Sequence, residues 1–199
     1  MESVEHKIER HIIKRGRDKV YLVDDFLRYG SEGAVRLALM RLAKKEMVVR
    51  VANGIYAYPK IDTQYGMGVI LPSTDRIAQL IAKRDKARIA PTGANALHIL
   101  GLSTQVPTNI VYLTDGTERK VKVYNHTIKF ILTSPKNLSY KSSMMQLVVA
   151  ALKEIGNNNV SEEDVKKIKT ALNKVSKEII EQDLTLAPVW IRKIIKEVV

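Results

Sequence analysis

One stretch, from Ser31 to Tyr58, limits the possible folds of this chain more than any other. Its first half repeats apolar residues with the 3.6-residue period of a helix that is apolar on one side only. The apolar positions are Val35, Ala38, Leu39 and Leu42. Basic residues fall on the other side, so this half predicts an amphipathic helix with a basic outer face.

The second half of this stretch changes from helical to strand-like patterning. Val49 and Val51 alternate with Arg50, and the Asn53-Gly54 pair that follows suits a two-residue hairpin turn. A helix with a basic outer face followed by a small basic hairpin is typical of the recognition helix and wing of a winged helix-turn-helix.

The residues before this stretch complete the order of elements in that motif. They predict a helix at 3–15, a short strand at 20–22 and a short helix at 23–29. The first helix is expected to bury Val4, Ile8, Ile12 and Ile13. We therefore predict an α+β fold that begins with a winged helix-turn-helix DNA-binding domain at residues 1–60.

Residues 61–199 are predicted to form a mixed α/β second domain with a helical C-terminal part. Residues 60–71 are interpreted as a linker or an extended segment whose apolar end, 67–71, packs on that domain. Strand patterns predict a small sheet near 109–133, and residues 142–199 predict a helical tail.

The tail contains the cleanest amphipathic pattern of the chain, after a capping box at Ser161–Asp164. Spacings of three and four residues predict one helix with a single apolar stripe. The stripe consists of Val165, Ile168, Leu172, Val175 and Ile179. It spans only two heptads, so we interpret it as domain core and not as an oligomer seam.

The net charge of +12 and the isoelectric point near 9.8 favour polyanionic partners. The excess is largest in the first two thirds, with 13 basic against 8 acidic residues in 1–60 and 10 against 5 in 61–140. A solvated basic surface without a partner is the alternative. The absence of cysteine excludes disulfides, thiolate catalysis and cysteine-bound zinc.

No apolar run is long enough to span a membrane, and the first residues lack the apolar core of a signal peptide. We therefore expect a cytoplasmic protein with no membrane partner.

Three segments resemble one known family. They are the N-terminal winged helix with its NGIYAYP wing, the run RIAPTGANALHILGLSTQVPTNIVYLTDG at 88–116, and KVKVYNHTIKF at 120–130. Over roughly residues 1–140 the chain is similar to the AbiEi-family antitoxins of type IV toxin–antitoxin systems. The helical tail has no residue-by-residue match.

This resemblance implies a function that composition and periodicity do not. It implies an antitoxin encoded beside a nucleotidyltransferase-like toxin, with a winged helix that binds double-stranded DNA repeats in its own promoter and represses the operon. The C-terminal domain would be needed to neutralise the toxin, without a stable complex. Two alternatives stay open: an enzyme that modifies the toxin, for instance by phosphoryl transfer, and a protein that blocks the toxin directly.

DNA contacts are expected from the outer face of the helix and from the wing. Arg36 is placed to read guanine, whereas Arg41 and Lys44 are better placed for phosphates. The wing contacts Arg50 and Asn53, together with Lys45, are expected to reach the DNA backbone or the minor groove. The predicted set is Ser31, Glu32, Arg36, Met40, Arg41, Lys44, Lys45, Arg50 and Asn53. The alternative interpretation is that the helix face and the hairpin are exposed to solvent and bind no DNA.

A second basic surface is predicted in the second domain. It consists of Arg84, Lys86, Arg88, Arg119, Lys120, Lys122 and Lys129. It has three interpretations: a second DNA-backbone surface, a surface for an acidic toxin or its nucleotide, or a solvated strand face that prevents edge aggregation.

No catalytic, metal or cofactor site is predicted. The sequence has no phosphate-binding glycine loop, no paired-carboxylate spacing and no metalloprotease or kinase motif. His98 lies among Ala, Leu and Ile, which favours a structural role, and Asp115 before Gly116 predicts a turn. Catalysis by residues that are distant in sequence remains open.

Overall fold

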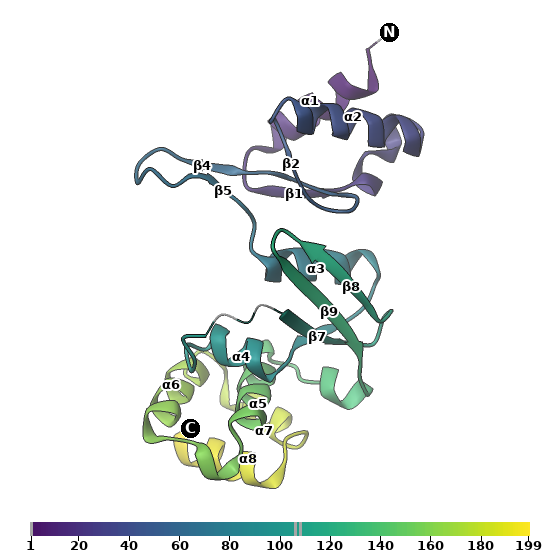
Figure 1. The fold of residues 1–199 in the computed structure, drawn as a ribbon. Helices are drawn as coiled ribbons and strands as arrows, with labels where there is room; N and C mark the ends of the chain where they lie inside the picture. Colours follow the sequence, from purple (N-terminus) through teal and green to yellow (C-terminus); the bar gives the residue numbers. More distant parts are fainter. Residues whose placement is uncertain (1, 106, 108) are drawn as a thin grey trace. The chain divides into compact units, whose positions relative to one another are not determined.

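A computed structural model describes residues 2–105, 107 and 109–199 of the chain (Figure 1). The fold is α+β, as predicted. The chain divides into two compact units: residues up to 78 with 122–125, and residues 79–121 with 126–199. The first unit therefore extends beyond residue 60.

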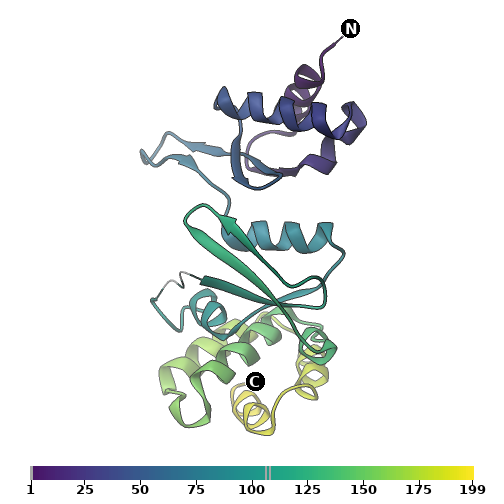
Figure 2. The same ribbon diagram turned by 45° about the vertical axis from the view of Figure 1, so that its right-hand side comes forward.

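The first unit begins with the predicted order of helices and strands. The order is α1 (Val4–Arg15), β1 (Lys19–Leu22), the 3-10 helix η1 (Val23–Tyr29), α2 (Glu32–Lys44), β2 (Val49–Ala52) and β3 (Ile55–Tyr58). The three strands form an antiparallel sheet in the order β1-β3-β2. This order of elements agrees with the one predicted for a winged helix-turn-helix (Figure 2).

Side-chain caps explain where these helices begin. The Ser3 hydroxyl accepts a hydrogen bond from the His6 backbone N–H, and the Ser31 hydroxyl accepts one from Ala34. Buried apolar side chains form the core between the helices and the sheet. The fully buried ones include Ile8, Ile12, Phe26, Val35, Leu39 and Leu42. The first helix buries Ile12 but leaves Ile13 56% exposed, so including Ile13 in the buried stripe was wrong.

The segment interpreted as a linker is a β-hairpin. Strand β4 (Lys60–Asp62) pairs antiparallel with β5 (Gly68–Ile70). Met67, Val69 and Leu71 at its apolar end are all exposed. The prediction missed the hairpin because its strands have only three residues each.

The second unit is built on a four-stranded sheet. Helix α3 (Thr74–Arg84) leads into it across the boundary, followed by β6 (Ile89–Pro91), α4 (Gly93–Ile99), β7 (Asn109–Thr114), β8 (Arg119–Val123), β9 (His126–Leu132) and the 3-10 helix η2 (Pro135–Leu138). The sheet order is β6-β7-β9-β8, with β6 antiparallel and β9 parallel to β7. The predicted sheet is therefore present, with β6 as a fourth strand.

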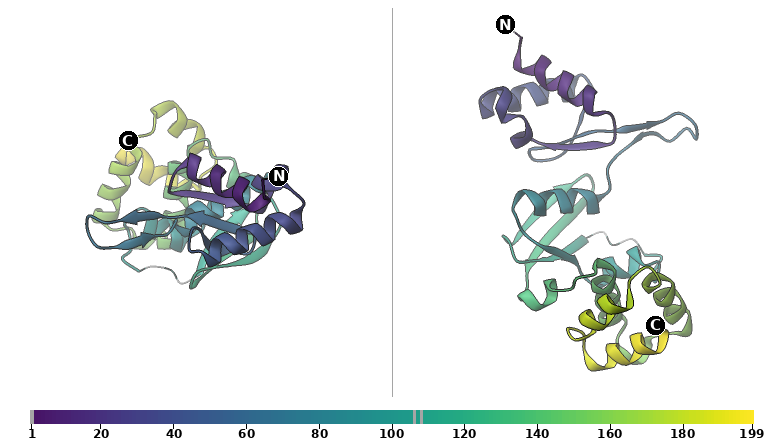
Figure 3. Two further views of the ribbon diagram at one scale, coloured as in Figure 1. Left: turned by 90° about the horizontal axis from the view of Figure 1, so that it is seen from above. Right: turned by 180° about the vertical axis from the view of Figure 1, so that it is seen from behind.

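The remainder of this unit is helical, as predicted. It contains α5 (Ser143–Ile155), the 3-10 turn η3 (Asn157–Asn159), α6 (Glu162–Leu172), α7 (Lys177–Leu184) and α8 (Val189–Val198). Figure 3 shows these helices gathered in one group. Their shared core includes Met145, Leu152, Ile168, Leu172, Ile191 and Ile195.

The stripe predicted on one helix after Ser161 is divided between two helices. Helix α6 ends at Leu172, and Ser176 precedes the start of α7. Because the break changes the direction of the chain, Ile180 is buried and Ile179 is only partly buried. The capping box at Ser161 and Asp164 is confirmed, as is the core role of Ile168 and Leu172.

No helix within the described residues is both long and apolar enough to cross a membrane.

Candidate nucleic-acid interface

Helix α2 presents one continuous exposed face. Its four buried residues all point into the winged-helix core, so the remaining positions face outward. The exposed positions are Glu32, Gly33, Arg36, Leu37, Met40, Arg41 and Lys44. All the helix positions predicted to contact DNA are therefore on the surface.

Arg36 is paired with Glu32 one turn earlier. Its Nε and Nη2 atoms donate hydrogen bonds to Glu32 Oε1 at 2.8 and 2.6 Å. The pair holds the guanidinium beside the first turn of α2, the part of a recognition helix that meets base edges. Since exposed ion pairs contribute little stability, separating Arg36 from Glu32 costs little free energy.

Arg41 and Lys45 share a carboxylate on α1. Lys45 Nζ lies 2.6 Å from Glu5 Oε1, and Arg41 Nη1 lies 3.6 Å from Glu5 Oε2. The hydrogen bond from Lys45 lowers the pKa of Glu5, and the same bond raises the pKa of Lys45. Lys45 thus binds α1 in this structure, which differs from its predicted place with the wing.

Lys44 is exposed and has no ion-pair partner within the described part of the chain. It is the cation of α2 most available to a phosphate.

The sequence prediction missed one residue of this face. Leu37 is 43% exposed, next to Met40 at 45%. Two apolar side chains at the centre of a basic helix face suit contact with thymine methyl groups in the major groove. The signal was present in the sequence, because Leu37 lies outside the buried stripe of the helix.

The wing is a tight two-residue turn. Gly54 has a φ of 70°, which favours glycine, and its carbonyl accepts a hydrogen bond from the Val23 N–H at 3.1 Å. Arg50 Nη2 donates to Asn53 Oδ1 at 2.9 Å, and both side chains are exposed. The turn is fastened to the start of η1 and presents Arg50 and Asn53 together.

The second basic surface is partly neutralised by neighbouring carboxylates. Arg84 and Arg119 both pair with Asp85. Arg119 lies over the Phe130 ring, 5.7 Å from its centroid, and burial, followed by the charge of Arg84, lowers the pKa of Arg119. This arginine packs against the sheet.

Arg88 is likewise engaged. Its backbone N–H and Nε donate to the two carboxylate oxygens of Asp115 at 2.7 and 2.8 Å. The side-chain hydrogen bond from Arg88 is the main cause that lowers the pKa of Asp115. Asp115 thus does more than make the predicted turn, because it joins the start of β6 to the end of β7.

The lysines of this surface remain more open. Lys86, Lys120 and Lys122 are exposed, and Lys129 is half-buried. Lys120 and Lys122 alternate with inward-facing valines on β8, as predicted for a half-buried strand.

The two histidines outside α1 have different surroundings. His98 is exposed on α4, so the apolar residues near it in sequence do not enclose it. His126 begins β9, and its Nδ1 atom is buried with no hydrogen-bond partner in the described part of the chain.

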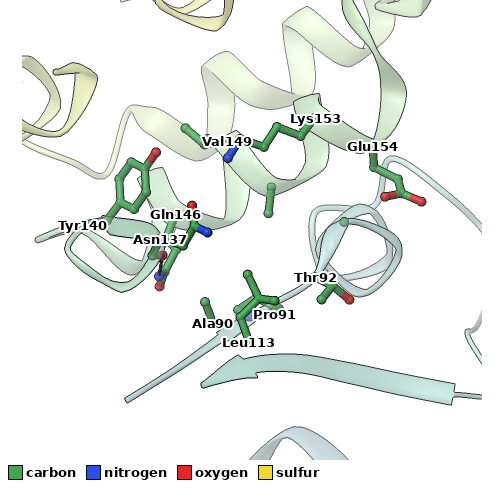
Figure 4. Close-up of a pocket in the computed structure, with 12 residues that line it drawn as sticks. Ala90, Pro91, Thr92, Leu113, Asn137, Tyr140, Gln146, Val149, Lys153 and Glu154 are labelled. Atoms are coloured by element: carbon green, nitrogen blue, oxygen red, sulfur yellow. Dashed lines mark hydrogen bonds between the residues drawn. The ribbon is translucent and has the colours of Figure 1, made fainter. Parts of the chain in front are cut away.

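A shallow pocket of about 190 Å³ lies between the sheet and α5 in the second unit (Figure 4). Some of its polar side chains already bind within the protein. Gln146 Nε2 donates to the Asn137 carbonyl at 2.8 Å, and the Thr92 hydroxyl donates to the Val111 carbonyl at 2.9 Å. Tyr140 also lines the pocket, and Lys153 and Glu154 on α5 form its charged border.

Residues 7–180 match the profile of a protein family described as a family of unknown function, DUF6088. The chain belongs to the DUF6088 family. The match includes α2, the wing and most of the second unit, so the DUF6088 pattern is not confined to the winged helix. The comparison with curated proteins gives no match.

Proposed function

We propose that this DUF6088 protein binds double-stranded DNA through α2 and the wing and represses its own operon. The observation that carries the proposal is the exposed face of α2. On this face, basic side chains lie beside two exposed apolar side chains, and the opposite side of the helix packs into the winged-helix core.

The contacts divide by their chemistry. Arg36, Leu37 and Met40 lie where base edges and thymine methyl groups are read. Arg41, Lys44 and Arg50 supply charge for phosphates, which gives affinity without sequence information. Ser31 remains the N-cap of the helix, and Glu32 orients Arg36 in the free protein.

The proposal includes a role as the antitoxin of a type IV system. Its support is the resemblance of residues 88–116 and 120–130 to AbiEi-family antitoxins. The partner would be a nucleotidyltransferase-like toxin encoded beside it, and the site of action the cytoplasm. Within this proposal the protein acts without a cofactor and is not an enzyme.

Co-expression with the adjacent reading frame tests the antitoxin role. We expect the neighbour to stop growth alone and the full chain to restore it. A harmless neighbour, or one that the chain does not counteract, would contradict the proposal.

The same cells distinguish the alternatives. A mass change of the toxin that requires the chain would indicate an enzyme, and co-purification at ordinary salt would indicate direct blocking. In parallel, a reporter gene under the control of the chain's own promoter tests repression. The double substitution Arg36→Ala and Lys44→Ala should relieve this repression.

A further inference from the structure

Strand β8 forms one edge of the four-stranded sheet (Figure 1). The sheet order is β6-β7-β9-β8, so β8 pairs with β9 on one side only. Only two residues connect Val123 to His126, which places these two residues opposite each other and Arg119 opposite Phe130. The Arg119 guanidinium lies 5.7 Å from the centroid of the Phe130 ring, which agrees with this register.

This register leaves backbone groups free along the open side of β8. In an antiparallel pair, the N–H and C=O groups of alternate residues point toward the partner strand and away from it. The pair next to the two-residue turn is hydrogen-bonded, so the groups that point away belong to Lys120 and Lys122. No backbone hydrogen bond joins either lysine to another segment of the described chain. An added strand would find two donors and two acceptors there.

The side chains of Lys120 and Lys122 are exposed and alternate with valines that face inward. In the same register, Lys120 lies opposite Lys129 of β9. None of these three lysines has an ion-pair partner within the described residues. Like charges that lie directly opposite each other destabilise a sheet. Carboxylates from a partner would therefore be favourable on this face.

Charge and shape exclude other occupants of this edge. A second copy of β8 would bring lysines next to lysines, which is unfavourable. A single-stranded nucleic acid stacks its bases on exposed aromatic rings, but the rings of Tyr112 and Phe130 are buried. The phosphates of duplex DNA could meet the ammonium groups, but they only accept hydrogen bonds and would leave the carbonyls of Lys120 and Lys122 without a donor.

An acidic extended peptide fits both the backbone and the side chains of this edge. Its own N–H and C=O groups complement those of β8. Alternate residues of a strand lie about 7 Å apart on one face, so carboxylates at every second position would meet Lys120 and Lys122 together. Ile131, which is exposed on the same face of β9 as Lys129, adds an apolar contact.

We propose that the open edge of β8 binds an acidic extended segment of a partner protein as an added strand, with alternate carboxylates of that segment beside Lys120 and Lys122. Main-chain hydrogen bonds supply affinity in this mode of binding, and the side chains select the sequence. The proposal depends neither on DNA binding by α2 nor on the antitoxin role.

Binding of a defined peptide to the full chain tests the proposal. The probe is a blocked, fluorescently labelled peptide of three valine–glutamate pairs, measured by anisotropy. We expect a dissociation constant below about 1 mM at low salt, and Lys120→Glu should raise it at least about tenfold. Lys193→Glu is the matched control, because Lys193 is also exposed and without an ion pair in the described part of the chain, but lies on α8.

No binding of the valine–glutamate peptide at about 1 mM would overturn the proposal. Equal weakening by Lys120→Glu and Lys193→Glu would also overturn it. A peptide of valine–lysine pairs should not bind. If Lys120→Glu weakened binding to random duplex DNA while the acidic peptide did not bind at all, this face would be a nucleic-acid surface and the proposal would be wrong.

Hydrogen exchange distinguishes an added strand from simple charge attraction. The amides of Lys120 and Lys122 point away from β9, so they should exchange fast in the free chain and become protected when the peptide binds. A peptide with N-methyl groups at alternate residues keeps its charges but cannot complete the main-chain hydrogen bonds. Equal affinity of this peptide, or no protection of the two amides, would contradict the added strand.

Discussion

Arg36 and Lys44 lie on the same exposed face of α2 but in different surroundings. Arg36 is oriented by two hydrogen bonds to Glu32, whereas Lys44 has no ion-pair partner within the described residues. An oriented planar guanidinium suits the reading of a guanine edge, and a mobile ammonium suits a phosphate. We therefore expect the two side chains to contribute differently to DNA binding.

Arg36→Ala should weaken specific binding more than non-specific binding. A bidentate contact to guanine is worth about 1–3 kcal/mol of discrimination, so the ratio of the two affinities should fall roughly 5- to 150-fold. Lys44→Ala is the control, and it should weaken both kinds of binding alike and reduce the salt slope by about 1. If Arg36→Ala lowered the affinity for operator DNA and for random DNA by the same factor, Arg36 would have no role in reading a base.

His11 makes the stability of the winged helix sensitive to pH. Its Nδ1 atom lies 2.9 Å from both the Tyr29 hydroxyl and Arg28 Nη2. Burial, followed by the charge of Arg28, lowers the pKa of His11 below its ordinary value of 6.5. The folded chain therefore favours neutral His11 more than the unfolded chain does.

The sign of the pH effect follows from this shift. The stabilisation is fully present above the unfolded pKa and is lost as the pH falls from about 6.5 toward the lower folded pKa. Urea unfolding should thus give a lower free energy of unfolding at pH 5.5 than at pH 7.5. His11→Gln should reduce this difference, and an unchanged difference in the variant would show that another group is responsible.

At the level of helices and strands, the sequence predicted elements with strong local signals and failed where tertiary contacts decide. The capping box at Ser161 and the Asn53-Gly54 turn both act locally, and both were predicted correctly. The hairpin at 60–70 was missed for a different reason, because strands of three residues are too short to show an alternating pattern. The break between α6 and α7 was missed because the apolar spacing continues through it.

Asp183 shows why that break exists. It is 1% exposed on α7, and its two carboxylate oxygens accept hydrogen bonds from the backbone N–H groups of Lys141 and Ser142 at 2.8 and 2.9 Å. The carboxylate fixes the start of α5 against α7. A straight continuation of α6 would need a different position for this group.

Asp183→Ala should lower the free energy of unfolding of the second unit by about 2–4 kcal/mol, because two part-buried backbone N–H groups lose the buried carboxylate that accepts from them. Glu181→Ala, at an exposed position on the same helix, should change it by less than about 0.5 kcal/mol. Chemical denaturation of the full chain compares them. Similar effects of the two substitutions would mean that the Asp183 bonds contribute little.

For the candidate site, as for the fold, the sequence predicted which residues are exposed better than it predicted which residues pair with each other. Every residue predicted on the outer face of α2 is exposed. Helical periodicity fixes which side of a helix faces outward, but it does not show that Lys45 pairs with Glu5 across 40 residues. The arginines near 84–119 were predicted as an open basic cluster, but the fold pairs Arg119 with Asp85 and Arg88 with Asp115.

At the scale of the whole molecule, the basic face of α2 would bind DNA and the second unit would carry the antitoxin role.

The most direct test of the central claim is the affinity of the full chain for its own upstream DNA. Fluorescence anisotropy should compare this duplex with a shuffled duplex of equal length and composition over a series of salt concentrations. We expect at least about 100-fold tighter binding to the upstream duplex and a steep fall of both affinities with salt. Equal affinity for the two duplexes at every salt concentration would contradict sequence-specific recognition by α2.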